Sequence, residues 1–162
     1  MLLRNDALTS DDSTSLSNFN NKEAKEERNK QIVKASTEGF STLNTDAVAK
    51  DFDPSIIDYS DGINPPVKGV GSFKYYCGQF FKAVTDMKGE NLNYVADGDW
   101  VIVWGDWHWT WKKDSTNKNA THTPFSMRGA DIFKLNEKGK VIEHYGIVQP
   151  MVKDSKSELT SN

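Results

Sequence analysis

Asp131 is a side chain in this sequence that could transfer protons. It interrupts an apolar stretch in which Met127 and Phe133 stand two or four residues away, so all three should share one face of a strand. A carboxylate enclosed in a dry pocket can act as a general acid or base. The alternative is a structural role, in which Asp131 pairs with Arg128 or accepts a hydrogen bond from a backbone amide.

His108 is a second candidate for acid–base chemistry, since histidine is the side chain that changes charge near neutral pH. It stands between tryptophans, and Asp106 precedes it by two residues. We expect either Asp106 or Asp131 to orient the imidazole of His108 for proton transfer. A structural histidine held by hydrogen bonds is the alternative.

Four more residues are expected to contact a ligand near the mouth of a pocket: Tyr59, His144, Tyr145 and Gln149. His144 and Tyr145 are neighbours in a predicted strand, so only one of them can point inward. The hydroxyl of Tyr59 could donate a hydrogen bond to a carbonyl or a developing enolate. Tyr59 could equally be a core aromatic residue whose hydroxyl reaches the surface.

All five tryptophans fall within one predicted strand. Alternation divides them between two faces, with Trp100, Trp104, Asp106 and His108 on one and Val101, Val103, Trp107, Trp109 and Trp111 on the other. We expect Trp104, Trp107 and Trp109 to contact a ligand, the alternative being that they form core and dimer interface. A bulge at Gly105 would exchange the faces beyond it.

Three helices are predicted in the part of the chain that precedes the long strands. Residues 23–43 predict a first helix, and Thr45 can cap a short second helix that Asp53-Pro54 ends. The clearest helix has a wide apolar face made of residues at helical spacing: Phe73, Tyr76, Cys77, Phe80, Phe81 and Val84.

Strand-like alternation dominates the rest of the chain. Short strands are expected at 56–60 and 92–96 and longer ones at 100–112, 125–135 and 141–149, with a strong turn signal at Asp97-Gly98. Helices followed by an antiparallel meander are typical of an α+β fold. A long, strongly curved strand that wraps around a helix would leave a cone between them, and the mouth of that cone would hold a ligand.

Composition narrows the classes of function. The 162 residues suit one domain, and the formal net charge of −3 argues against a surface that tracks nucleic-acid phosphates. Cys77 is the single cysteine, so no intramolecular disulfide is possible. It falls on the apolar face of a predicted helix and should be a buried small hydrophobe, with a nucleophile as the alternative. The histidines lack metal-site spacing and no glycine-rich phosphate loop follows a strand, so we expect neither a metal nor a nucleotide cofactor.

The two ends of the chain are polar. We expect residues 1–21 to form a flexible arm, residues 22–152 the folded domain, and residues 153–162 a polar tail. No apolar run is long enough to span a bilayer. A cytoplasmic protein is expected, and an exported or lipid-anchored form would require a signal segment that has been removed.

The order and spacing of several short motifs resemble the nuclear transport factor 2-like superfamily, and within it the SnoaL-like polyketide cyclase branch. The resemblance covers nearly all of residues 28–150 and implies a cone-shaped, cystatin-like fold in which a curved sheet wraps around the N-terminal helices. It also implies a homodimer packed through the outer face of the sheet. The motifs are Lys68-Gly69, Thr85-Asp86-Met87, Ala96–Val101, Arg128–Phe133 and Gly139–Tyr145.

The sequence departs from this branch at Gly146, where many relatives carry an aspartate after the aromatic residue. Glycine cannot transfer a proton through a side chain. The resemblance therefore implies a domain that binds a small hydrophobic or carbonyl-containing molecule in an aromatic pocket, and leaves two functions open. One is a cofactor-free isomerase, cyclase or dehydratase that uses Asp131 or His108. The other is a non-catalytic dimeric binding or scaffold module.

Overall fold

The structure, a computed structural model, describes residues 10–60, 65–113 and 122–149. Its elements follow in the order α1 (Ser10–Ser41), α2 (Thr45–Val48), β1 (Phe52–Asp58), β2 (Val67–Lys68), α3 (Val70–Ala83), β3 (Val84–Asp97), β4 (Trp100–Trp111), β5 (Thr123–Leu135) and β6 (Val141–Gln149). Within these ranges, no helix is both long and apolar enough to cross a membrane.

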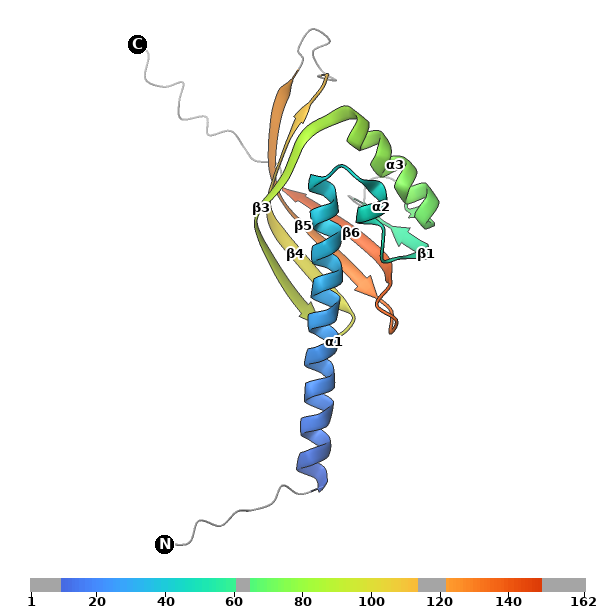
Figure 1. The fold of residues 1–162 in the computed structure, drawn as a ribbon, viewed down its shortest axis with the longest axis vertical. Coiled ribbons are helices and arrows are strands. Elements are labelled where there is room, and N and C mark those ends of the chain that lie inside the picture. The colour runs from blue at the N-terminus through green and yellow to red at the C-terminus, as the bar shows by residue number, and fades with distance from the viewer. Residues whose placement is uncertain (1–9, 61–64, 114–121, 150–162) are drawn as a thin grey trace, which may run out of the picture.

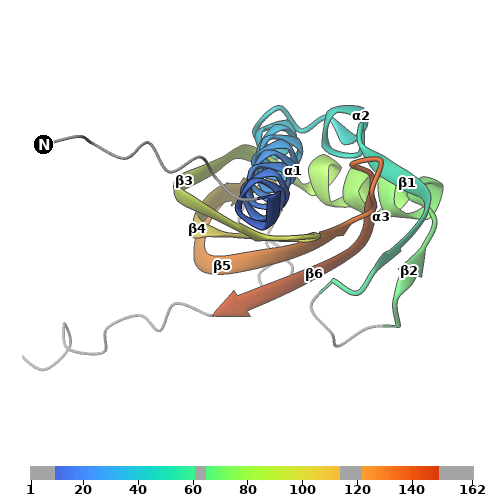
Figure 2. The same ribbon diagram turned by 90° about the horizontal axis from the view of Figure 1, so that it is seen from below.

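The strands form one curved sheet in the order β2-β1-β6-β5-β4-β3. All three helices lie on its concave side (Figures 1 and 2). The predicted α+β fold, with an antiparallel meander from β3 to β6, is confirmed. The sheet as a whole is mixed, because β1 and β6 are parallel. The meander starts with β3 at the far edge of the sheet, and its last strand, β6, lies beside β1.

Helix α1 begins earlier than the sequence predicted. It starts at Ser10 instead of near Glu23, so residues 10–21, expected to be part of a flexible arm, are helical. Figure 1 shows this half of α1 extending beyond the sheet. No glycine or proline stands between Ser10 and Glu38, so a helix anchored on the sheet can propagate outward. Residues 1–9 and the predicted tail at 153–162 lie outside the described residues.

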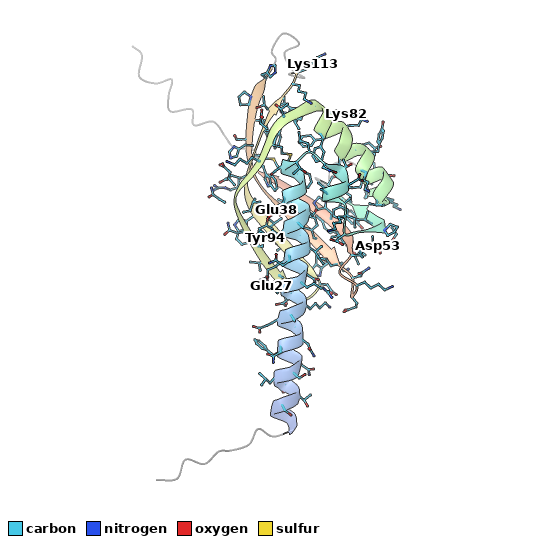
Figure 3. The ribbon with its side chains drawn as sticks, viewed as in Figure 1. Glu27, Glu38, Asp53, Lys82, Tyr94 and Lys113 are labelled. Atoms are coloured by element: carbon cyan, nitrogen blue, oxygen red, sulfur yellow. The ribbon has the colours of Figure 1, made fainter. Side chains whose placement is uncertain are left out.

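The other half of α1 is fixed to the sheet by polar contacts as well as by its apolar face. The buried Asn29 donates a hydrogen bond from Nδ2 to the carbonyl of Gly98 at 3.1 Å. Thr37 and Tyr94 join their hydroxyls at 2.7 Å, and Figure 3 shows Tyr94 beside the helix. Gly98 has a φ of +59°, as expected for the turn between β3 and β4.

Two local predictions between α1 and α3 are wrong. The side chain of Asn44, and not of Thr45, caps α2 by accepting hydrogen bonds from the amides of Asp46 and Ala47. Pro54 lies inside β1 instead of ending a helix. The pairing of β1 with β6 is irregular between Phe52 and Ile57, so a residue without an N–H group is tolerated there.

Strand β4 divides its tryptophans between the two faces as predicted. Trp107 and Trp109 are buried with Val101 and Val103 on the concave face, whereas Trp100 and Trp104 are exposed on the convex face. Gly105 pairs with Gly129 in an unbroken register, so no bulge in β4 exchanges the faces. The irregularities lie instead in β3, between Thr85 and Lys88 and between Glu90 and Asn93.

Candidate functional site

A histidine between two carboxylates lies on the concave face of the sheet. Nδ1 of His144 is 2.9 Å from Oδ1 of Asp58, and Nε2 of the same ring is 3.5 Å from Oδ1 of Asp131. The exposed fractions of the three side chains are 13% for His144, 9% for Asp58 and 28% for Asp131. Asp131 is therefore the carboxylate that is more open to a ligand.

The sheet register brings these three residues together. Asp58 of β1 and His144 of β6 are cross-strand partners in the parallel pair. Asp131 of β5 is paired with Gly146, which is two residues after His144 and therefore on the same face. Because three strands hold the three side chains, their separation is fixed by the backbone of the sheet.

The electrostatics of the triplet favour a charged imidazole. Burial alone would lower the pKa of His144, but hydrogen bonds and charge interactions with Asp131 and Asp58 outweigh it and raise that pKa to about 9. Burial opposes ionisation of Asp58 as well, yet the contacts with His144 and Ser60 hold the pKa of Asp58 below its ordinary value. At neutral pH the site therefore holds an imidazolium beside an ionised Asp58.

Two adjacent cavities open onto this triplet, and we call them together the chamber. A cavity of about 190 Å³ is lined by Phe40, Phe80, Met87, Trp107, Trp109, Met127, Asp131 and His144. A second cavity of about 250 Å³ is lined by Phe40, Asp58, Ser60, Phe73, Tyr76, Cys77, Phe80 and His144. They share the side chains of Phe40, Phe80 and His144. The second cavity also borders a wider opening of about 590 Å³ at Asp58, Ser60 and Tyr76.

Four residues that the sequence singled out as site residues line this chamber: Asp131, His144, Trp107 and Trp109. Of the pair His144 and Tyr145, the histidine is the one that faces inward. The expected partner of Asp131 is different, however. Arg128 pairs with Asp106 on the convex face, at 2.8 Å, and Asp131 pairs with His144.

The expectation that Asp106 or Asp131 orients His108 is wrong. His108 lies on the convex face, because it is an odd number of residues from Trp107 and Trp109 along an unbroken strand. Its Nδ1 lies 2.8 Å from the hydroxyl of Ser126, and its Nε2 lies 3.4 Å from a carboxylate oxygen of Glu90. These contacts support the structural alternative.

Three other residues expected to contact a ligand do not line the chamber. Trp104 is exposed on the convex face. Tyr59 and Tyr145 stack on each other with ring centres 4.5 Å apart, and the hydroxyl of Tyr145 donates a hydrogen bond to Glu143. Neither tyrosine is among the residues that line the two cavities. Gln149 ends β6, and its side chain lies outside the described part of the structure.

The residue missed from the sequence is Asp58. It was assigned to a short strand but not to the site. A signal was present, because Asp58 stands two residues after Ile56, which is fully buried, and must share its face. A carboxylate on the buried face of a strand needs a charged partner. That partner could not be named without knowing that β1 lies beside β6.

Gly146 has a structural explanation. A Cβ atom there would lie 3.2 Å from the carbonyl oxygen of Ser60 and 3.6 Å from Oδ1 of Asp131. An aspartate at 146 would therefore be tight against the carbonyl of Ser60, and its Cβ would be in ordinary contact with Asp131. The carboxylates of this site come from β1 and β5 instead of from position 146.

Cys77 lines the second cavity but is poorly suited to act as a nucleophile. Burial, with a smaller contribution from the charge of Asp58, raises the pKa of its thiol to about 12.

Among the described residues, no group of three or more histidine, cysteine, aspartate or glutamate side chains is arranged to hold a metal ion.

Solved structures share this fold at low sequence identity. A proposed polyketide cyclase from Xanthomonas campestris pv. campestris is 15% identical with a TM-score of 0.70, over 77% of this chain and 93% of that chain. AclR, a proposed hydroxylase from Streptomyces galilaeus, is 18% identical with a TM-score of 0.65, over 76% and 90%. A protein of ketosteroid isomerase-like fold from Catenulispora acidiphila, bound to trimethylamine, is 13% identical with a TM-score of 0.61, over 74% and 85%.

No curated protein matches the sequence. The family of SnoaL-like domains, however, matches residues 33–144, which is well over half of the chain. This range runs from the last third of α1 to His144 and so includes Asp58 and Asp131. The chain belongs to the family of SnoaL-like domains, within the nuclear transport factor 2-like superfamily.

Proposed function

We propose that this protein binds a small, mostly apolar molecule in the chamber and transfers protons to and from it through Asp131 and His144. The observation that carries the proposal is the placement of His144 between Asp58 and Asp131 in the wall of an aromatic cavity. Charged groups that are partly buried in a cavity and perturb one another are typical of catalytic sites.

Each member of the triplet has a role that follows from its contacts. Asp131 is the more exposed carboxylate and lies in the first cavity, so it is the group that takes a proton from a ligand. His144 is an imidazolium that stabilises negative charge developing nearby. Asp58 is a positioning residue, since its hydrogen bond to Nδ1 fixes the orientation of the ring. This arrangement suits isomerisation, cyclisation or dehydration at a carbon beside a carbonyl group.

Proton transfer can be tested without knowing the natural substrate. One-ring ketones such as cyclohexanone exchange the hydrogens beside the carbonyl slowly in deuterated water, and NMR follows the exchange. The proposal predicts that the full chain accelerates exchange above the buffer rate. Asp131→Asn should abolish the acceleration, and His108→Gln, a change on the convex face, should retain it. Equal rates for the wild-type chain and Asp131→Asn would refute the catalytic role.

A non-catalytic role of the chamber is the second candidate. Its support is the apolar character of the walls, which need no chemistry to hold a ligand. The two candidates separate in the exchange experiment. Binding of the ketones without accelerated exchange would assign the chamber to ligand capture alone.

We also propose that the convex face of the sheet packs against a second copy of the chain. Cross-strand pairing aligns apolar residues on this face into a row: Val95, Ile102, Ile132 and Tyr145. A parallel row contains Trp104 and Ile147, and charged pairs such as Asp106–Arg128 flank both rows. An apolar centre with a charged rim is the usual anatomy of a protein interface.

The dimer can be tested by analytical ultracentrifugation. The wild-type chain should sediment as a dimer at micromolar concentration, and Trp104→Glu should sediment as a monomer because each two-fold interface would then bury two uncompensated charges. Asp106→Asn at the rim serves as the control and should remain dimeric. A monomeric wild-type chain would contradict the proposal.

A further inference from the structure

We propose that the chamber selects a compact organic cation, such as a protonated amine, over neutral and anionic molecules of the same shape. This inference rests on the proposed function, because it assumes that the chamber is where a ligand binds. It adds the charge and the size of that ligand, which membership of the family does not supply.

The first argument is the charge of the lining. The residues that line the two cavities include two carboxylates, Asp58 and Asp131, and one imidazole, His144, but no lysine or arginine. The triplet therefore contains two acidic groups against one basic group. Lys68 is the nearest lysine in the lining of the connected space, and it stands in the outer opening. A ligand carboxylate in the chamber would therefore face uncompensated negative charge.

The second argument is the nature of the walls. Phe40 meets Trp107 edge to face with ring centres 6.1 Å apart, and Phe80 meets Trp109 edge to face at 5.6 Å. Rings at steep angles to one another form the sides of an enclosure. Aromatic faces attract cations through the ring quadrupole, and enclosures of this kind are known to bind substituted ammonium groups. The aromatic side walls and the carboxylate of Asp131 would therefore both attract a cation.

The third argument is size. The cavity that contains Asp131 measures about 190 Å³. A cavity of about 150 Å³ is known to hold one benzene molecule, and drug-sized ligands occupy pockets of about 300 to 1,000 Å³. One ring or a small branched group therefore fits beside Asp131, and a fused system of three or four rings does not fit there.

Two groups in the chamber favour a different ligand. The imidazolium of His144 repels a cation, but it lies between two carboxylates, Asp58 and Asp131. The indole N–H of Trp109 is buried and has no hydrogen-bond partner among the described residues, and this donor needs an acceptor atom, which an ammonium group does not offer. Hydrogen bonds that involve an ionised partner are roughly twice as strong as neutral ones, however. The carboxylate of Asp131 should therefore outweigh Trp109 in choosing between an ammonium and a hydroxyl group.

Three ligands of one ring each test this inference: benzylamine, benzyl alcohol and benzoate. Chemical shifts of ¹³C-labelled methionine methyl groups in the full chain report binding, because Met87 and Met127 line the cavity. At neutral pH and low salt we expect benzylamine to bind at least about tenfold more tightly than benzyl alcohol. Benzoate should leave both methyl signals unchanged.

Two variants locate the source of the preference. Asp131→Asn should bring the affinities for benzylamine and benzyl alcohol to within about twofold, and Asp106→Asn on the convex face should leave their ratio unchanged. If Asp131→Asn does not fold, intermolecular nuclear Overhauser effects between benzylamine and the Met127 methyl group of the wild-type chain replace it. Absence of those effects would place the amine elsewhere and overturn the inference.

The outcomes separate this inference from the proposed function. Equal or tighter binding of benzyl alcohol, with shifts at Met87 and Met127, would overturn the cation preference and leave the chamber as the binding site. No shift at either methionine with any of the three ligands would contradict both proposals. Tighter binding of benzoate would overturn the charge argument outright.

Discussion

The two faces of the central sheet use the same kinds of residue for different purposes. On the concave face, Trp107 and Trp109 are buried and His144 is held between two carboxylates. On the convex face, Trp104 is exposed and His108 contacts a serine and a glutamate at the surface. The residue types alone therefore do not locate the site. What distinguishes His144 is that it is buried and that the two neighbouring strands, β1 and β5, each place a carboxylate beside it.

The largest expected difference between the faces is in packing. Trp107→Ala removes a side chain that is 4% exposed and should lower the free energy of unfolding by about 3 to 5 kcal/mol. Trp104→Ala removes one that is 40% exposed and should cost less than about 1 kcal/mol, measured at a fixed concentration because of the proposed dimer. Urea denaturation of both variants measures the two free energies of unfolding. Equal decreases in Trp107→Ala and Trp104→Ala would contradict the proposed difference in packing between the two faces.

The second difference is in the dependence of stability on pH. The folded chain raises the pKa of His144 from 6.5 to about 9, so the folded state holds a proton that the unfolded state releases between these values. The contribution of His144 to the free energy of unfolding should therefore be complete below pH 6.5. It should fall by about 3 kcal/mol as the pH rises through 9.

Variants of the two histidines assign that fall. His144→Gln should flatten the curve between pH 6.5 and 9, and His108→Gln should retain it. A retained fall in His144→Gln, measured by denaturation at each pH, would assign the effect to another group.

The third difference concerns carboxylates. Asp58→Asn leaves His144 without a charged partner at Nδ1 and should lower the free energy of unfolding at neutral pH by about 1 to 3 kcal/mol. Asp106→Asn breaks a surface pair with Arg128 and should cause no measurable change. Thermal denaturation followed by circular dichroism compares the two. A larger loss in Asp106→Asn would contradict the assignment of the faces.

The smallest effect is expected where α1 leaves the sheet. Phe19 is exposed on the extended half of the helix, and Phe19→Ala should change the free energy of unfolding by less than about 0.5 kcal/mol. Val33→Ala, at a fully buried position of the same helix, provides the contrast and should be clearly destabilising. A marked loss in Phe19→Ala would show that the extension packs against something.

The sequence predicted the elements better than it predicted the site. Alternation in β4 sorted its tryptophans onto the correct faces, and the apolar stripe of α3 identified that helix. Both patterns are local, since they depend on neighbours along the chain. The start of α1 was missed because the polar residues after Ser10 carry no apolar stripe, and only the absence of helix breakers allows the helix to continue.

The site depends on pairing between distant strands, which periodicity does not reveal. Asp131 was predicted to be a site residue, but its partner was sought in His108 and Arg128 and is in fact His144. Asp58 was missed, since the parallel pairing of β1 with β6 joins segments more than 80 residues apart. A rule that flags charged residues on the buried face of any predicted strand would have found Asp58 and Asp131 together.

The central claim is that His144, and not His108, is the charged imidazole of a ligand site. NMR titration of the ring signals, with each histidine identified by its glutamine variant, tests it directly. We predict that His144 titrates with a pKa of about 9. When benzylamine is added at constant pH, the ring signals of His144 should shift and those of His108 should not. A His144 that titrates at the ordinary value of 6.5, or a response to the ligand confined to His108, would contradict the account.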